Sequence, residues 1–296
     1  MSLKPIAFFI ITTALVSNNA VSQDKLITKE FDFNFEPTGK NTLYYSYKGD
    51  AKPDIFINNG KEEINLSHSP ETWDIEPDYS PDGTKIIYSS GPSMANMNLR
   101  IMNADGSNIK EFYQSNRTKV GADWSPDGKK ILFSAIDPET RDADIMVINS
   151  DGSGVKNLTE DFSGTSTSPS WSPDGKKIIF INKPSNDGQQ DIYTMNANGG
   201  NKTRLTDTEI TKRGPVFTPD GRVIIYAGAK TEDDLVHLYA ISAQNPEKKS
   251  IGRQLTYGNS SEYLAAFTPN GIHMTYSTGD WTKGFKMDHQ PIPTRP

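Results

Sequence analysis

A nine-residue segment recurs along the chain and narrows the possible folds more than any other feature. The segments at 125–133 (SPDGKKILF) and 172–180 (SPDGKKIIF) are almost identical, and looser copies begin at residues 80, 218 and 268. The spacings between consecutive copies are 45, 47, 46 and 50 residues, and a degenerate sixth copy begins at Glu36. Repeats of this length, with short apolar runs between turn signals, are typical of β-propellers that have one four-stranded blade per repeat. The spacing therefore predicts an all-β, six-bladed β-propeller of antiparallel blades.

Two aromatic columns accompany the repeat. The residue immediately before each copy is Phe35, Tyr79, Trp124, Trp171, Phe217 or Phe267. Eight residues after the start of each copy stands Tyr44, Tyr88, Phe133, Phe180, Tyr226 or Tyr276. Large rings on neighbouring strands fill the space between twisted, stacked sheets, so we expect both columns in the core between blades.

The Ser/Thr-Pro-Asp-Gly motif has the composition of a tight turn. Proline presets φ at the first corner, aspartate can bond its own backbone, and glycine accepts a positive φ. A second turn recurs as Asn103–Ser107 and Asn149–Ser153, which lack the 12-residue ligand pattern of a calcium loop. In an up-and-down blade both turns fall on one face of the ring. The loops between the second and third strands, and those between blades, then share the opposite face, which we call the variable-loop face.

The N-terminal segment differs from the repeats. Lys4 is followed by an apolar run at 5–16 and by small residues before Gln23, as in a secretory signal with cleavage after Ser22. We expect residues 1–22 to be a signal peptide, residues 23–296 to be a single propeller domain, and the mature protein to be periplasmic or secreted. An uncleaved anchor is the alternative, although the run is short for a bilayer span.

Charge and cysteine content exclude several classes of protein. The formal charge is −6, the pI is about 5.3 and no basic patch stands out, so we expect no nucleic-acid partner. The chain has no cysteine, which excludes disulfides, thiolate metal sites and a lipidated N-terminal cysteine. After signal cleavage we expect no membrane span and, most simply, a monomer.

The repeat resembles that of a known family. The aromatic-Ser/Thr-Pro-Asp-Gly run, followed by an apolar strand and by Asp-Ile-Tyr-x-Met-Asn-x-Asp/Asn-Gly, resembles the propeller repeat of the TolB-like family over residues 36–288. It is also similar to the propeller regions of prolyl-oligopeptidase-type peptidases. The resemblance implies a fold and a bacterial envelope location, but not a function. TolB itself carries an α/β domain before its propeller, and only about a dozen residues separate the expected cleavage site from the first repeat here, which leaves a role in the Tol–Pal system open.

The sixth repeat departs from the pattern. Asn270 replaces aspartate, and the segment at 284–287 replaces the Asp-Ile-Tyr strand. Little chain remains for an outer strand. We expect the N-terminal strand at 25–30 to supply it and so to close the ring, because an open blade leaves unpaired strand edges.

We expect function on the variable-loop face, where loop sequences differ between blades. Residues five and six positions before each motif vary in charge and size around the ring, which suits an asymmetric ligand. The candidate binding residues at the channel mouth are Trp73, Asp74, Lys119, Arg213, Glu262, Tyr263 and Trp281. Tryptophan, tyrosine and arginine dominate many binding interfaces, and aromatic faces also suit sugars. Taken singly, each residue also fits a purely structural role: the tryptophans could pack under their own loops and the charges could be solvated.

Catalytic signals are sparse. The chain has no Gly-x-Ser-x-Gly motif, and its four histidines, at positions 68, 237, 273 and 289, lack the spacing of a metal motif. Oligogalacturonate lyases are similar propellers with a histidine-rich metal site that finds no match here. We therefore assign no catalytic residue and no cofactor, although the acidic runs 142–144 and 232–234 leave a divalent cation open.

The leading prediction is an exported, non-catalytic propeller that binds a protein, a peptide or an oligosaccharide. The alternative is a carbohydrate-active lyase or hydrolase at the channel mouth, with Asp74 and Glu262 as an acid/base pair. Histidines brought together with carboxylates in the structure would favour this alternative.

Overall fold

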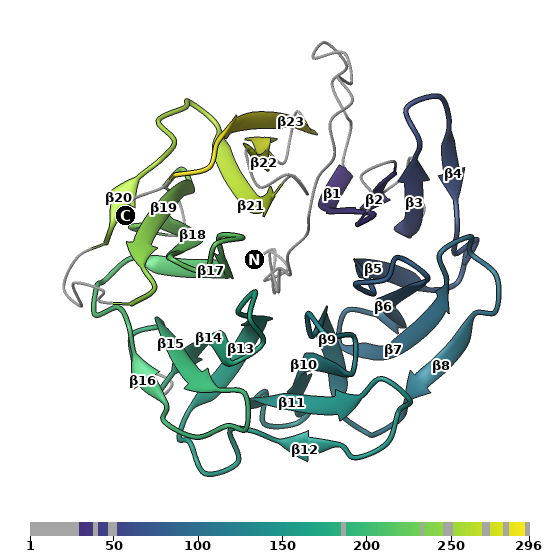
Figure 1. Ribbon diagram of the computed structural model, residues 1–296, viewed down its shortest axis with the longest axis horizontal. Coiled ribbons are helices and arrows are strands. Elements are labelled where there is room, and N and C mark those ends of the chain that lie inside the picture. Colours follow the sequence, from purple (N-terminus) through teal and green to yellow (C-terminus); the bar gives the residue numbers. More distant parts are fainter. Residues whose placement is uncertain are drawn as a thin grey trace, which may run out of the picture.

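The computed structural model describes residues 30–37, 41–46, 52–184, 188–231, 234–244, 251–267, 273–280 and 284–293. Within these ranges the chain forms six antiparallel sheets arranged around a common axis (Figure 1). In each sheet the strands pair in chain order, so every blade is an up-and-down meander. The predicted six-bladed, all-β propeller is confirmed.

The first three blades span residues 30–157. Blade 1 consists of β1 (Glu30–Phe35), β2 (Thr42–Ser46), β3 (Asp54–Asn58) and β4 (Glu63–Asn65). Blade 2 consists of β5 (Trp73–Tyr79), β6 (Lys85–Ser93), β7 (Asn96–Asn103) and β8 (Lys110–Tyr113). Blade 3 consists of β9 (Thr118–Trp124), β10 (Lys130–Ile136), β11 (Ala143–Asn149) and β12 (Lys156–Asn157).

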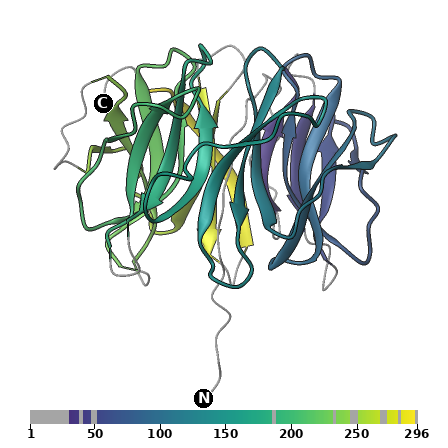
Figure 2. The ribbon, with the colours of Figure 1, turned by 90° about the horizontal axis from the view of Figure 1, so that it is seen from below.

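The last three blades complete the ring. Blade 4 consists of β13 (Thr165–Trp171), β14 (Lys177–Lys183), β15 (Asp191–Asn196) and β16 (Thr203–Arg204). Blade 5 consists of β17 (Thr211–Phe217), β18 (Val223–Ala229), β19 (His237–Ser242) and β20 (Arg253–Gln254). Blade 6 consists of β21 (Ser261–Phe267), β22 (His273–Asp280) and β23 (Gly284–Pro291). Seen from the side, the strands run between the two faces of the ring (Figure 2).

The repeated Ser-Pro-Asp-Gly motif forms the turn between the first and second strands. In blade 2 the Gly83 amide donates to the Ser80 carbonyl at 2.8 Å, and Gly83 adopts a φ of +69°. The Ser80 hydroxyl donates to Asp82 Oδ1 at 2.6 Å. This bond and that from the Thr84 amide hold the pKa of Asp82 below its usual value. The same turn bond recurs in blades 3, 4 and 5, so in blades 2 to 5 the motif is a structural turn, as its composition predicted.

The aromatic columns lie in the core wherever their side chains are described. Tyr88 packs between blades 1 and 2 with Leu43 and Ile55, all fully buried. Phe133 occupies the corresponding place between blades 2 and 3 with Leu99 and Trp124. Each core cluster thus joins two neighbouring blades, so packing between blades rather than within a single blade holds the ring together.

The inner strands share a bulge four residues before each motif. Gly121 and Gly214 have positive φ values there, and so do two residues with side chains, Glu76 (φ +53°) and Ser168 (φ +52°). The pairing of inner and second strands shifts register at this point in every blade. A bulge turns local backbone N–H groups away from their own sheet, so these groups need partners elsewhere.

Blade 6 has three strands within the described residues, and β1 packs against its β21 and β23. Glu30, expected at the end of the closing strand, instead begins the inner strand of blade 1. Residues 25–29 and the predicted signal peptide lie outside the described residues, so closure by an N-terminal outer strand stays a prediction. No helix in the described part of the chain is long and apolar enough to cross a membrane.

One connection on the variable-loop face is shorter than the repeat suggests. Residues 90–98, at the connection between the second and third strands of blade 2, are mostly strand, because β6 and β7 remain paired up to Ser93 and Asn96. Gly91 allows this close pairing, since a Cβ atom there would lie 1.8 Å from the Asn96 carbonyl oxygen. Blade 2 therefore carries a longer hairpin than its neighbours.

Candidate functional site

Three of the predicted site residues are buried charges at the junctions between blades. Asp74, Lys119 and Glu262 lie near the start of inner strands, on the variable-loop face, with exposed fractions of 0%, 0% and 3%. Their hydrogen bonds go to the preceding blade or to nearby loop groups, not to one another. The structure therefore spreads these three residues over separate junctions, and their role in ligand binding stays a prediction.

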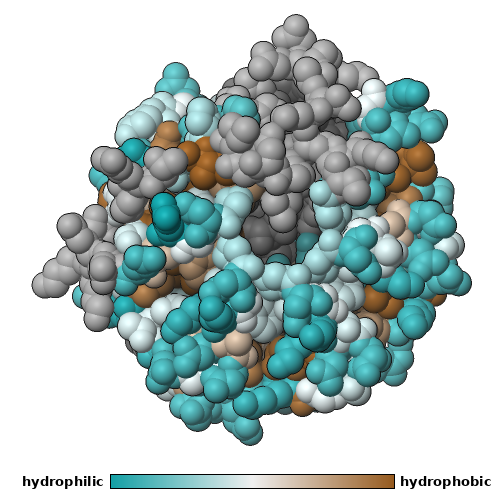
Figure 3. Space-filling view, viewed as in Figure 1, coloured by the Kyte–Doolittle hydropathy of each residue, from teal (hydrophilic) through white to brown (hydrophobic). Residues whose placement is uncertain are grey.

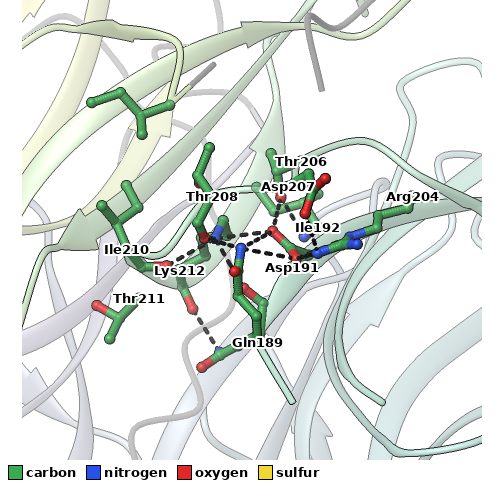
Figure 4. Close-up of polar contacts among 12 residues, drawn as sticks. Gln189, Asp191, Ile192, Arg204, Thr206, Asp207, Thr208, Ile210, Thr211 and Lys212 are labelled. Carbon is green, nitrogen blue, oxygen red and sulfur yellow. Dashed lines mark hydrogen bonds and ion pairs between the residues drawn. The ribbon is translucent and has the colours of Figure 1, made fainter. Parts of the chain in front are cut away.

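The junction between blades 4 and 5 shows the arrangement most completely (Figure 4). The fully buried Lys212 ammonium donates to the carbonyl oxygens of Gln190, Thr208 and Ile210 at 2.9, 2.6 and 2.8 Å. It also lies 3.0 Å from Asp191 Oδ1. Burial lowers the pKa of Lys212, and the hydrogen bond to Asp191 opposes this shift. Full satisfaction of the donors makes this buried charge tolerable.

Asp191 is itself shared among several donors. Its carboxylate accepts the Thr206 hydroxyl at 2.7 Å and the Arg204 guanidinium. The Ile192 amide in turn donates to the Thr206 hydroxyl at 3.0 Å. This network joins β15, the loop after β16 and β17, and it accounts for the recurrent Asp-Ile and Leu-Thr pairs of the sequence as structural parts.

Lys119 repeats this arrangement between blades 2 and 3. Its ammonium donates to Asn98 Oδ1 at 2.7 Å and to the carbonyls of Ser115 and Arg117 at 3.0 and 2.8 Å. Desolvation lowers the pKa of Lys119 to about 8. The amide of Asn98 stands where Asp191 stands in blade 4, so this lysine has no full counter-charge at the junction.

Between blades 5 and 6 the inner strand supplies the carboxylate and the preceding blade supplies the nitrogen group, the reverse of the pair formed by Lys212 and Asp191. Glu262 Oε2 lies 2.7 Å from His237 Nδ1 and 3.3 Å from the Thr256 hydroxyl. Burial raises the pKa of Glu262, while the hydrogen bond and charge of His237 oppose the shift. With Glu262 ionised, His237 donates from Nδ1 and presents Nε2 as a potential base. The His237 side chain keeps 18% of its surface exposed.

The remaining predicted residues have mixed environments. Trp73 is half-buried against a cluster that contains Ile75 and Val120. Tyr263 is buried in the cluster between blades 5 and 6, and Arg213 is half-buried in β17. Trp281 lies outside the described residues. Trp73 and Tyr263 thus contribute to packing, and all four remain untested as binding residues.

The sequence analysis missed a set of buried carboxylates on the inner strands. Glu76 Oε2 accepts the Gly121 amide of the next blade at 2.8 Å. Asp78 Oδ2 accepts the Trp124 amide at 2.9 Å, and Asp123 Oδ2 accepts the Trp171 amide at 2.7 Å. We call Glu76, Asp78 and Asp123 the inner carboxylates. They could have been found by reading the columns four and two residues before each motif.

Two of the inner carboxylates, Glu76 and Asp123, have raised pKa values. Burial raises the pKa of Glu76 to about 8, although the Gly121 amide and the Ser89 hydroxyl oppose the shift. Burial likewise raises the pKa of Asp123 to about 7 against the bonds from Trp171 and Ser170. These groups bind protons more tightly in the folded state than in the unfolded chain, which links the stability of the ring to pH.

The variable-loop face exposes several large hydrophobic side chains. Met94 lies at the tip of the blade 2 hairpin, Leu235 precedes β19 and Tyr257 follows Thr256, with exposed fractions of 36%, 43% and 75%. Tyr257 lies in the same loop as the hydroxyl that bonds Glu262. The junction of blades 5 and 6 therefore combines an exposed ring with a partly exposed imidazole, a combination that suits recognition of a ligand.

The opposite face carries two grooves between blades. One, of about 1060 Å³, is lined by the turns at Ser80–Asp82 and Pro126–Gly128 together with Trp124. The other, of about 1000 Å³, is lined by the corresponding turns of blades 4 and 5. In the space-filling view, small hydrophobic patches lie among hydrophilic side chains around the ring (Figure 3). Both grooves are walled by the repeated turns, so they follow from the repeat.

Metal-binding clusters are not evident. Among the residues that the structure describes, no group of three or more histidine and carboxylate side chains is placed to hold a metal ion. In the acidic run 142–144, Asp144 pairs with Arg117 at 2.6 Å. In the other run, residues 232 and 233 lie outside the described ranges.

Comparison with known proteins identifies the repeat. The family model described as "TolB beta propeller domain" matches residues 91–292. No curated protein matches the sequence.

Several solved structures share the fold. A protein described as a TolB of Agrobacterium tumefaciens superposes with a TM-score of 0.66 at 18% identity, over 90% of this chain and 91% of that one. TolB of Acinetobacter baumannii superposes with a TM-score of 0.62 at 20% identity, over 88% of this chain and 62% of that one. An oligogalacturonate lyase of Vibrio parahaemolyticus superposes with a TM-score of 0.57 at 13% identity, over 93% of each chain. At these identities the likeness shows the fold alone.

Proposed function

The chain belongs to the TolB beta-propeller family, and from this premise we propose that it is an exported, non-catalytic binding protein. Its ligand is a protein, a peptide or an oligosaccharide that contacts the variable-loop face. The observation that carries the proposal is the contrast between the two faces. The turns of one face repeat from blade to blade, whereas the other face exposes different side chains in different blades.

The exposed side chains favour the junction of blades 5 and 6 as the contact surface. Tyr257 is 75% exposed and Leu235 is 43% exposed, while the side chain of His237 in blade 5 is 18% exposed. Aromatic and aliphatic anchors next to polar groups are typical of binding hot spots. The buried charges behind them hold the blades in register, so this surface is presented on a rigid scaffold.

Export is proposed from the N-terminal charge, apolar run and small residues. Placement in the periplasm would expose the variable-loop face to envelope proteins and glycans. Secretion of the mature chain from Gln23 onward, followed by N-terminal sequencing, tests this part separately.

Paired surface variants test the binding proposal. The mature protein would be titrated with envelope peptides and oligosaccharides, and binding would be measured by calorimetry. We expect Tyr257→Ala to weaken binding about tenfold or more. Val155→Ser, which removes a side chain 41% exposed in blade 3 near the repeated turns, serves as the control and should bind normally. Equal losses in both variants would contradict the proposal.

A second function is favoured by one observation. The contact between His237 and Glu262 has the geometry of an imidazole base oriented by a carboxylate, and oligogalacturonate lyases are among the structures that share the fold. Under this alternative, His237 would abstract a proton from a sugar substrate at the channel mouth. Turnover of oligosaccharides that disappears in His237→Asn would support the enzyme, and turnover unaffected by that change would exclude this base.

A further inference from the structure

The junctions between blades follow a common pattern on the variable-loop face. At three junctions, a residue near the start of an inner strand contacts a residue near the start of the third strand in the preceding blade. The pairs are Lys119 with Asn98, Lys212 with Asp191, and Glu262 with His237. In each pair an acceptor oxygen meets a cationic or N–H donor group. At each of these three junctions, a donor group from one blade thus lies against an oxygen atom from the neighbouring blade.

At the junction of blades 1 and 2 the corresponding residues are Asp74 and Asp54. The Asp74 amide donates to the carbonyl of Pro53, just before Asp54, at 2.9 Å. In the same way the Glu262 amide donates to the carbonyl of Val236, just before His237, at 2.8 Å. The backbone at the junction of blades 1 and 2 therefore corresponds to that at the junction of blades 5 and 6. At the first of these junctions two carboxylates, Asp74 and Asp54, occupy the positions that hold an acceptor and a donor in the three pairs above.

The buried phenol of Tyr88 is influenced by both carboxylates. Tyr88 faces blade 1 and is fully buried. Burial raises the pKa of its phenol, and the charges of Asp74 and Asp54 raise it further. The charges of both carboxylates therefore act on the same buried phenol.

Asp74 has an unused acceptor inside this junction. Its Oδ1 accepts the Thr72 hydroxyl at 2.9 Å and the Ser90 hydroxyl at 2.6 Å. Its Oδ2 is buried and has no hydrogen-bond partner, in a residue that is 0% exposed. A buried carboxylate oxygen without a partner is costly, so a ligand of opposite charge is expected there.

Among the residues that the structure describes, the two cations nearest this junction, Lys52 and Arg100, have other contacts. The Lys52 ammonium donates to the carbonyls of Glu71 and Pro92 at 2.5 and 3.3 Å. Arg100 lies beside Tyr88 and opposes the rise in its pKa. Within the described contacts, neither forms an ion pair with Asp74. Within the described ranges, therefore, no side chain supplies to Asp74 the positive charge that Lys212 supplies between blades 4 and 5.

We propose that the junction of blades 1 and 2 binds a hard divalent cation, with Asp74 as its principal ligand and Asp54 as its second carboxylate. The neighbouring groups are carboxylate, hydroxyl and carbonyl oxygens, which suit calcium or magnesium rather than softer metals. Each Asp54 oxygen already accepts bonds from Asn65, Ser67 or Ser69 but retains lone-pair capacity. Main-chain oxygens or water would complete the coordination shell.

Metal titration of the full chain tests the site. Protein stripped with chelator would be titrated by calorimetry with calcium chloride and with magnesium chloride. Its melting temperature would be followed at constant ionic strength. We expect saturable binding of one ion and a rise of about 3 °C when the free ion reaches ten times its dissociation constant. The absence of a shift with both metals would overturn the proposal.

Two substitutions at one position separate a metal site from a merely structural carboxylate. Asp74→Asn should abolish the metal-dependent rise. Asp74→Lys, which installs the side chain found at 119 and 212, should melt near the metal-bound wild type and ignore added metal. Glu262→Gln, at the junction of blades 5 and 6, is the control and should retain the rise. A full metal response in Asp74→Asn, or loss of the response in the control alone, would refute the assignment; if Asp74→Asn does not fold, Asp54→Asn takes its place.

Discussion

Replacement of Glu76 by glutamine should remove much of the pH dependence of stability. Burial raises the pKa of this carboxyl from 4.5 to about 8. At pH values between 4.5 and about 8, Glu76 therefore keeps its proton in the folded protein but loses it in the unfolded chain. In that window stability falls as pH rises, by about 1.4 kcal/mol per pH unit for one such group. From pH 5 to pH 8 the loss due to Glu76 is at most about 4 kcal/mol.

Glutamine keeps the shape and the oxygen that accepts the Gly121 amide but cannot ionise. We expect Glu76→Gln to match the wild type within about 1 kcal/mol at pH 5 and to be more stable by several kcal/mol at pH 8. Asp123, with a pKa raised to about 7, leaves a residual slope in the variant. The aspartates of the turns have lowered pKa values, so their contribution is lost only in more acidic solution.

Urea unfolding followed by tryptophan fluorescence at pH 5, 6, 7 and 8 measures this effect, with Glu160→Gln on the surface as the matched control. The control should follow the wild-type curve at every pH. Wild-type stability that is flat or rises over this range would refute the reasoning. Equal destabilisation of Glu76→Gln at pH 5 and pH 8 would show instead that an ionised Glu76 stabilises the ring.

Three further substitutions test the structural account. Lys212→Met removes one of the donors to Asp191 and the ammonium that binds three carbonyls. It should lower the free energy of unfolding by about 3 kcal/mol, measured by urea denaturation. Gly91→Ala forces a Cβ atom against the Asn96 carbonyl. It should lower the free energy of unfolding by about 2 kcal/mol or open the β6–β7 hairpin. Faster amide exchange at residues 91–97 would reveal the opening. Asp82→Ala removes three local hydrogen bonds of a turn and should cost about 1 kcal/mol without changing ligand affinity. A large loss of affinity would mean that the turn is part of a site.

The fold could be predicted because its signals are local. A turn such as 80–83 depends on the proline, aspartate and glycine within it, and its recurrence at a nearly constant spacing determines the number of blades. The aromatic columns were predicted as core for the same reason, and Tyr88 and Phe133 are fully buried. The extension of the β6–β7 hairpin was missed, because pairing across a loop is decided by contacts such as that of Gly91 with Asn96.

The candidate site was harder to predict because its contacts cross between blades. Lys212 meets Asp191 and Glu262 meets His237 across 21 and 25 residues of sequence. The column that contains Asp74, Lys119 and Glu262 was recognised, but a sequence column does not reveal whether its side chains face solvent or the neighbouring blade. The inner carboxylate Glu76 was missed because its partner, a bulged backbone amide, carries no sequence signal.

The most direct measurement for the central claim is hydrogen–deuterium exchange of the mature protein with and without a ligand identified by titration. Our account predicts slower exchange in the loops of the variable-loop face, chiefly at 230–236 and 255–260, and unchanged exchange in the repeated turns of the opposite face. Protection confined to the turns at 80–83 and 125–128, or to the groove beside Trp124, would contradict it and would assign function to the repeat itself.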